Sequence, residues 1–70
     1  MQIEILIKQI RKNKGITLQR LSILSGISAT HINDIENNLK MPSLIVMILL
    51  SKSLKVNITE TFKIRNKRDL

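Results

Sequence analysis

Apolar residues recur along this chain at the three- and four-residue spacing that places side chains on one face of a helix. The first group with this spacing contains Ile3, Leu6, Ile7 and Ile10. A helix with that buried face is expected to end at Lys14–Gly15, because basic residues suit a helix C-terminus and glycine accepts a left-handed cap. The pattern therefore predicts a helix at the start of the chain.

Two further helices follow, and each has a side-chain oxygen where it begins. Thr17 precedes the second helix, which ends at Gly26, and Ser28 precedes the third. The third helix is expected to end at Asn37–Asn38, since asparagine takes the left-handed conformation more easily than most other residues. The inward positions of the two helices are Leu18, Leu21, Leu24, Ile32 and Ile35.

The clearest boundary in the chain is Met41-Pro42-Ser43, because proline lacks a backbone donor and disfavours helix at the residue before it. Ser43 can cap a fourth helix, Leu44–Leu54, which is apolar nearly all round. Its inward positions are expected to be Leu44, Met47, Ile48 and Leu50. Ile45 and Leu49 are then left exposed, and an exposed aliphatic pair suggests a surface for a partner.

A short fifth helix is predicted over Ile58–Phe62, and the chain has no evident strand pattern or internal repeat. The fold class is therefore all-α, a compact five-helix domain over residues 1–62. Residues 63–70 form a basic C-terminal tail that we expect to be flexible. This tail is as compatible with contact to DNA as with a solubilising role.

Composition limits the chemistry that the chain can perform. Its 70 residues suffice for one small domain, and the absence of cysteine removes disulfides, thiolate metal sites and cysteine nucleophiles. The single histidine, His31, cannot form a histidine-based metal site alone, so we expect a surface residue there. No activated nucleophile, carboxylate pair or phosphate-binding loop is recognisable. We therefore expect neither an enzyme nor a metal or cofactor.

Charge indicates the class of partner. The chain has 12 Lys and Arg residues against 5 acidic residues, a net charge of +7, which favours nucleic acid. With one aromatic residue, Phe62, the chain lacks the stacking surfaces of single-strand binders, so duplex DNA is expected. No signal peptide is recognisable, and the longest apolar run is far below the roughly 20 residues of a membrane span. A cytoplasmic location without membrane contact is the expectation.

The segment Gly26-Ile27-Ser28 forms a short turn between the second and third helices. Two helices joined by such a glycine-containing turn are typical of a helix-turn-helix, whose second helix enters the major groove of DNA. Ile27 is expected to fill the angle between the helices. The outer side of the third helix has small polar residues, which allow a helix to approach base edges in a groove about 12 Å wide.

Three motifs extend this pattern in register, without insertion or deletion. They are Arg11-x-x-Lys14-Gly15-Ile16-Thr17, then Leu21-x-x-x-x-Gly26-Ile27-Ser28-x-x-x-Ile32-x-x-Ile35-Glu36, and Pro42-Ser43-Leu44 followed by Leu54-x-Val56-x-Ile58. With these motifs the segment Ile10–Leu54 resembles the Cro/lambda-repressor type of helix-turn-helix domain, also called the Xre family.

The resemblance implies a role for each part of the motif. The third helix would be the recognition helix, with base contacts at Ala29, Thr30, Asn33 and Asp34. Phosphate contacts would fall on Thr17, Leu18, Asn37, Asn38 and Lys40. A structural ion pair between Arg11 and Glu36 would connect the first helix to the end of the third.

Four residues depart from the family pattern. Leu18 replaces a frequent glutamine and has no side-chain donor, and Ala29 and Asp34 replace frequent arginines. A carboxylate at Asp34 lowers affinity for phosphates unless it accepts a hydrogen bond from a cytosine amine. Lys55 stands where glycine often ends the fourth helix, so a strained turn is expected there.

Together these observations predict a DNA-binding transcription regulator, most simply a repressor, of bacterial, phage or mobile-element origin. We expect a homodimer, joined through Ile45 and Leu49, on a palindromic operator. One alternative is an antitoxin or a restriction–modification controller, in which Ile45 and Leu49 would contact a protein partner. Another is a helix-turn-helix interaction module with weak DNA binding, which the substitutions at Leu18, Ala29 and Asp34 favour.

Overall fold

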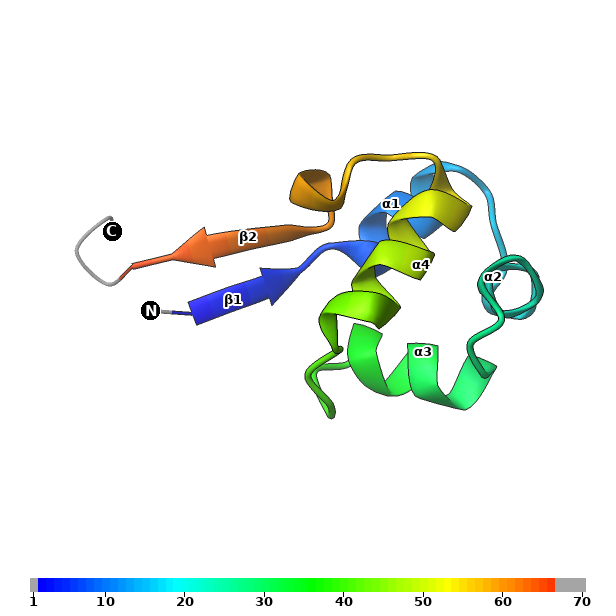
Figure 1. Ribbon diagram of the computed structural model, residues 1–70, viewed down its shortest axis with the longest axis horizontal. Coiled ribbons are helices and arrows are strands. Elements are labelled where there is room, and N and C mark those ends of the chain that lie inside the picture. Colours follow the sequence, from blue (N-terminus) through cyan, green and yellow to red (C-terminus); the bar gives the residue numbers. More distant parts are fainter. Residues whose placement is uncertain (1, 67–70) are drawn as a thin grey trace.

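Helices make up most of the described chain, and two short strands bring its ends together (Figure 1). The computed structural model describes residues 2–66. In chain order the elements are β1 (Gln2–Ile5), α1 (Ile7–Asn13), α2 (Leu18–Ser25), α3 (Ala29–Glu36), α4 (Leu44–Leu54), a 3₁₀ helix (Ile58–Glu60) and β2 (Phe62–Arg65). Within these residues, no helix has the length and apolar character needed to cross a membrane.

Polar caps define where α2, α3 and α4 begin. The hydroxyls of Thr17, Ser28 and Ser43 each accept a hydrogen bond from the backbone N–H three residues later, at 3.0, 3.1 and 3.1 Å. Each bond satisfies a donor that the first turn of the helix leaves without a partner. The three predicted caps are confirmed, and so is the predicted range of α4.

The core lies where the four helices meet. Its buried apolar side chains are Ile7, Leu21, Ile27, Ile32, Ile35, Met47, Leu50 and Leu54. The predicted inward positions are wrong for Leu24, Leu44 and Ile48, which are 46%, 70% and 37% exposed. Because α4 is apolar nearly all round, its sequence does not indicate which face is buried. Contact with α2 decides this, and the helical step of 100° per residue turns Leu44 and Ile48 toward solvent.

The two ends of the described chain form strands rather than helices. β1 pairs with β2 in an antiparallel register that places Gln2 opposite Arg65 and Ile5 opposite Phe62. The all-α, five-helix prediction is therefore wrong at both ends, since α1 begins only at Ile7 and the expected fifth helix is a single 3₁₀ turn. The tail expected from residue 63 is wrong as far as Arg65, which belongs to β2. Residues 67–70 of that tail lie outside the described residues.

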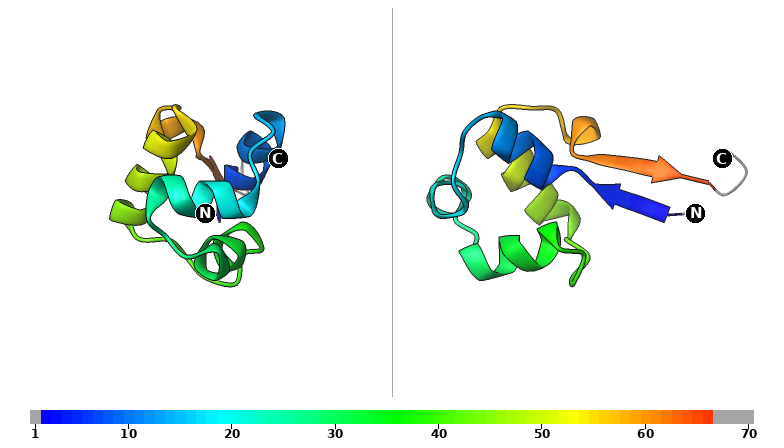
Figure 2. Two further views of the ribbon diagram at one scale, coloured as in Figure 1. Left: turned by 90° about the vertical axis from the view of Figure 1, so that its right-hand side faces the viewer. Right: turned by 180° about the vertical axis from the view of Figure 1, so that it is seen from behind.

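Each strand owes its conformation to the other. Both alternate polar and apolar residues over only four positions, QIEI in β1 and FKIR in β2. An alternation this short is also compatible with a helix end, so pairing between distant segments decides the outcome. Ile5 and Phe62 pack against the core at the base of the ribbon. Beyond them the ribbon extends away from the helices and gives the molecule a long axis of 39 Å (Figure 2).

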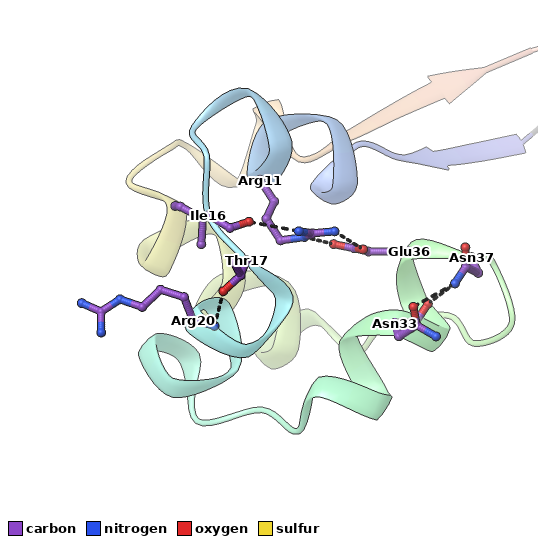
Figure 3. Close-up of polar contacts among 7 residues, drawn as sticks. All are labelled: Arg11, Ile16, Thr17, Arg20, Asn33, Glu36 and Asn37. Carbon is purple, nitrogen blue, oxygen red and sulfur yellow. Dashed lines mark hydrogen bonds and ion pairs between the residues drawn. The ribbon is translucent and has the colours of Figure 1, made fainter.

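One guanidinium connects α1 to the loop before α2 and to the end of α3 (Figure 3). Arg11 Nε and Nη2 donate to the two carboxylate oxygens of Glu36 at 2.8 and 3.0 Å, and Nη1 donates to the carbonyl oxygen of Ile16 at 3.0 Å. The hydrogen bond with Glu36 raises the pKa of Arg11, against the opposing effect of burial. The ion pair implied by the family resemblance is thus present, between side chains only 11% and 2% exposed.

Replacing Glu36 with glutamine should lower the free energy of unfolding by about 3 kcal/mol, because the substitution leaves the Arg11 charge buried without its partner. Urea denaturation followed by circular dichroism measures this loss. The matched control is Glu4→Gln, which removes an exposed pair with Arg65 at 3.3 Å and should cost less than about 1 kcal/mol. Equal losses in the two variants would contradict a structural role for the Arg11–Glu36 pair.

Lys55 ends α4 in the left-handed conformation, with a φ of 58°, as the departure from glycine suggested. Replacing it with glycine should raise the free energy of unfolding by about 0.5–1 kcal/mol, because glycine takes this conformation without a steric penalty. The same substitution at Lys52, inside the helix, should instead destabilise the protein by about 1 kcal/mol. Thermal unfolding of both variants tests the opposite signs, and a destabilised Lys55→Gly variant would exclude strain at this cap.

Candidate DNA-binding surface

Hydrogen bonds across its glycine hold the turn between α2 and α3. Gly26 has a φ of 76°, a left-handed conformation that glycine adopts without strain. Two hydrogen bonds span this glycine: the Ser22 hydroxyl donates to the carbonyl oxygen of Ile27 at 2.6 Å, and the Ile27 N–H donates to the Ser25 hydroxyl oxygen at 3.2 Å. Ile27 itself is buried in the angle between the helices, as predicted. These contacts hold α3 in a defined orientation relative to α2.

α3 directs one side to the core and the other to solvent. Ile32 and Ile35 are fully buried, whereas Thr30 and Asn33 are exposed and Ala29 and Asp34 are half-buried. The four residues expected to contact bases therefore all retain accessible surface on one helix. Figures 1 and 2 show α3 at the margin of the helical body, where a large partner can approach it.

An amide pair that the sequence analysis missed lies on the exposed side of α3. The Asn37 side-chain NH₂ donates to the Asn33 carbonyl oxygen at 2.9 Å and to the Asn33 side-chain oxygen at 3.1 Å (Figure 3). The four-residue spacing of the two asparagines was the available signal. The contact orients the Asn33 amide, whose oxygen can accept a second hydrogen bond and whose NH₂ group can donate.

The two groups of residues expected to contact phosphates are positioned by Arg11. Its partners Ile16 and Glu36 directly precede Thr17 and Asn37 in the chain. One side chain therefore sets the beginning of α2 and the end of α3 relative to each other.

At the beginning of α2, the Thr17 hydroxyl caps the helix as an acceptor and keeps its proton for donation to an anion. Leu18 is half-buried against the core and has no polar side chain. Its contribution at a phosphate is limited to its backbone N–H in the first turn of the helix. The Leu18 side chain is thus unsuited to the phosphate contact that the family resemblance implies for it.

After α3, the chain makes a turn that leaves Asn37, Asn38 and Lys40 exposed. Asn38 has a left-handed φ of 61°, and the N–H of the next residue, Leu39, donates to the carbonyl oxygen of Asp34 at 2.8 Å. α3 therefore ends at Asn37–Asn38, as the sequence predicted. The exposed amides and ammonium group follow α3 directly.

Positive charge is scarce on α3 itself. The helix contains no lysine or arginine, and Asp34 has no ion-pair partner within residues 2–66. The nearest cations along the chain are Arg20 and Lys40, both exposed. His31 is half-buried, and in the part of the chain that the structure describes no three acidic or histidine side chains could together hold a metal ion. The surface of α3 is thus suited to hydrogen bonding more than to charge attraction.

Known proteins share this arrangement. A helix-turn-helix family model matches residues 7–60. Among solved structures, the restriction-modification controller protein C.AhdI from Aeromonas hydrophila superposes with a TM-score of 0.76 at 24% identity, over 77% of this chain and 82% of that one. The N-terminal DNA binding domain of SinR from Bacillus subtilis gives a TM-score of 0.71 at 35% identity, over 76% and 78% of the two chains. No curated protein sequence matches the chain significantly.

The range matched by the family model runs from the start of α1 to the end of the 3₁₀ helix. It contains the turn at Gly26, the Arg11–Glu36 ion pair and every residue of the candidate surface, and it leaves out the two strands. The chain therefore belongs to the Cro/C1-type helix-turn-helix family.

Proposed function

We propose that this protein is a cytoplasmic transcription regulator, a repressor that binds a palindromic DNA operator as a homodimer. The observation that carries the proposal is the outer side of α3, where small polar side chains stand on a helix held in place by the Gly26 turn. A helix of this kind fits a major groove about 12 Å wide. The SinR domain that is 35% identical to this chain is a DNA-binding domain, which supports the proposal.

Each α3 residue suits a different base edge. The Asn33 amide, with one donor group and one acceptor, matches adenine, and the Asp34 carboxylate can accept from the cytosine amine. The Ala29 methyl group suits the methyl group of thymine, and the Thr30 hydroxyl can bond either kind of base edge. Thr17, Leu18, Asn37, Asn38 and Lys40 would bind phosphates on either side and fix the register without carrying sequence information.

The outer face of α4 supplies the proposed dimer interface. Ile45 and Leu49 are 70% and 39% exposed, and their exposed neighbours Leu44 and Ile48 extend them into one aliphatic stripe. A two-fold contact between two such stripes removes apolar surface from water on both protomers. A palindromic operator requires a dimer whose two α3 helices lie about one helical turn of DNA apart, ~34 Å. A dimer bound there would block access of RNA polymerase.

Thr30→Ala and Asn33→Ala should each weaken binding to the preferred operator by about 1–3 kcal/mol with the fold intact, because each removes a contact with a base edge. Lys40→Ala should weaken binding to preferred and random duplexes alike and reduce the slope of log K against log salt by about 1. Fluorescence-anisotropy titrations measure both effects. Unchanged sequence preference in both α3 variants would mean that another element contacts the bases.

Ile45→Glu combined with Leu49→Lys should convert the dimer into a folded monomer, because burial of the two charges at the interface is unfavourable. Light scattering gives the mass and circular dichroism the helix content. The matched control is Ile23→Glu, which alters a residue on α2 that is 73% exposed and should leave the mass unchanged. A double variant with the mass of a dimer would rule out the α4 interface.

A further inference from the structure

We propose that the β1–β2 ribbon is part of the DNA-binding surface and holds backbone phosphates beside the end of α3. This inference rests on the proposed function and extends it to two cations, Lys63 and Arg65, on an element outside the range of the family match.

A cleft of about 480 Å³ separates the ribbon from the turn that follows α3. The ribbon contributes Gln2, Ile3, Glu4, Ile5 and Arg65 to its lining, and the turn contributes Asn38, Lys40 and Met41. Two of these turn residues, Asn38 and Lys40, are proposed phosphate ligands. The ribbon therefore continues the same surface beyond the recognition helix, and in Figures 1 and 2 β1 is the strand nearer to α3.

The strand register places the polar side chains of the ribbon on one face. Gln2 lies opposite Arg65, and Glu4 lies opposite Lys63. Directly opposite residues of an antiparallel pair share a face, so these four side chains lie on one face of the ribbon, and Gln2, Glu4 and Arg65 of this face line the cleft. The other face has Ile3 and Ile64. The polar face thus presents two cations and one carboxylate.

Within this face, Glu4 restrains Arg65 without covering it. Arg65 Nη2 lies 3.3 Å from Glu4 Oε1, and the two side chains remain 49% and 41% exposed. The guanidinium has further donors with which it can bind a phosphate oxygen. The carboxylate has the opposite effect, because it repels phosphates and occupies part of the guanidinium.

Charge complementarity favours a DNA backbone as the partner of this face. α3 contains no lysine or arginine, so a helix that enters the major groove brings almost no attraction of its own. A DNA strand that passes the end of α3 meets Asn38 and Lys40 first and the ribbon cations next. Neutralisation of phosphates by such cations releases counterions, which makes affinity steeply salt-dependent.

The test is a salt titration of the full chain with a random-sequence duplex, followed by fluorescence anisotropy. The double variant Lys63→Gln/Arg65→Gln should reduce the slope of log K against log salt by about 2, one per lost contact. The matched control is Lys52→Gln/Lys55→Gln, which removes the same charge at the far end of α4 and should keep the wild-type slope. Circular dichroism checks that both variants retain the fold.

A second variant, Glu4→Gln, should change the affinity for DNA in the opposite direction, and this test does not depend on the stability of the double variant. Loss of the carboxylate frees Arg65 and should tighten DNA binding relative to wild type, whereas a merely structural Glu4–Arg65 pair would leave binding unchanged or weaker. If the wild type binds duplex DNA but the double variant keeps its slope, or Glu4→Gln fails to tighten binding, the ribbon inference is wrong and the proposed function stands. A wild type that does not bind duplex DNA at low salt would overturn both.

Discussion

The geometry of the proposed DNA-binding surface depends on Arg11. Its guanidinium is hydrogen-bonded both to the carbonyl oxygen of Ile16, just before α2, and to the carboxylate of Glu36, at the end of α3. Apolar packing holds these helices together but tolerates small shifts, whereas three hydrogen bonds to one planar group do not. Because the Glu36 side chain is almost fully buried, its negative charge is neutralised by Arg11 and is not exposed to DNA. The two groups of proposed phosphate ligands thereby keep a constant separation.

In the proposed binding mode, attraction to phosphates and recognition of bases come from different parts of the molecule. α3 offers amide, hydroxyl, methyl and carboxylate groups but no cation, and the chain as a whole has a net charge of +7. Contacts to phosphates supply affinity and position, and contacts to base edges supply discrimination. In this account, cations on the turn after α3 and on the ribbon supply the attraction. In the proposed binding mode, the replacements of usual family arginines at Ala29 and Asp34 shift attraction away from α3 without removing its capacity to discriminate.

Local signals predicted much of this structure. Thr17, Ser28 and Ser43 cap helices and Gly26 forms the turn, because each depends on residues at short spacing. The Arg11–Glu36 pair joins distant parts of the chain, and only the family resemblance implied it. Properties that depend on distant contacts were not predictable in this way. The strands exist because the two ends of the described chain meet, and the buried face of α4 is chosen by its neighbour. For this reason the predicted start of the first helix and the predicted fifth helix were wrong, and the cleft beside the ribbon had no sequence signal.

The most direct test of the central claim is selection of duplexes from a random-sequence pool by the purified protein at two salt concentrations. The account predicts enrichment of an inverted repeat whose half-sites are about one helical turn apart, with retention that falls steeply as salt rises. Retention of DNA without enrichment would reduce the binding to charge attraction and contradict recognition by α3. No retention even at low salt would contradict DNA binding altogether and favour a protein partner for Ile45 and Leu49.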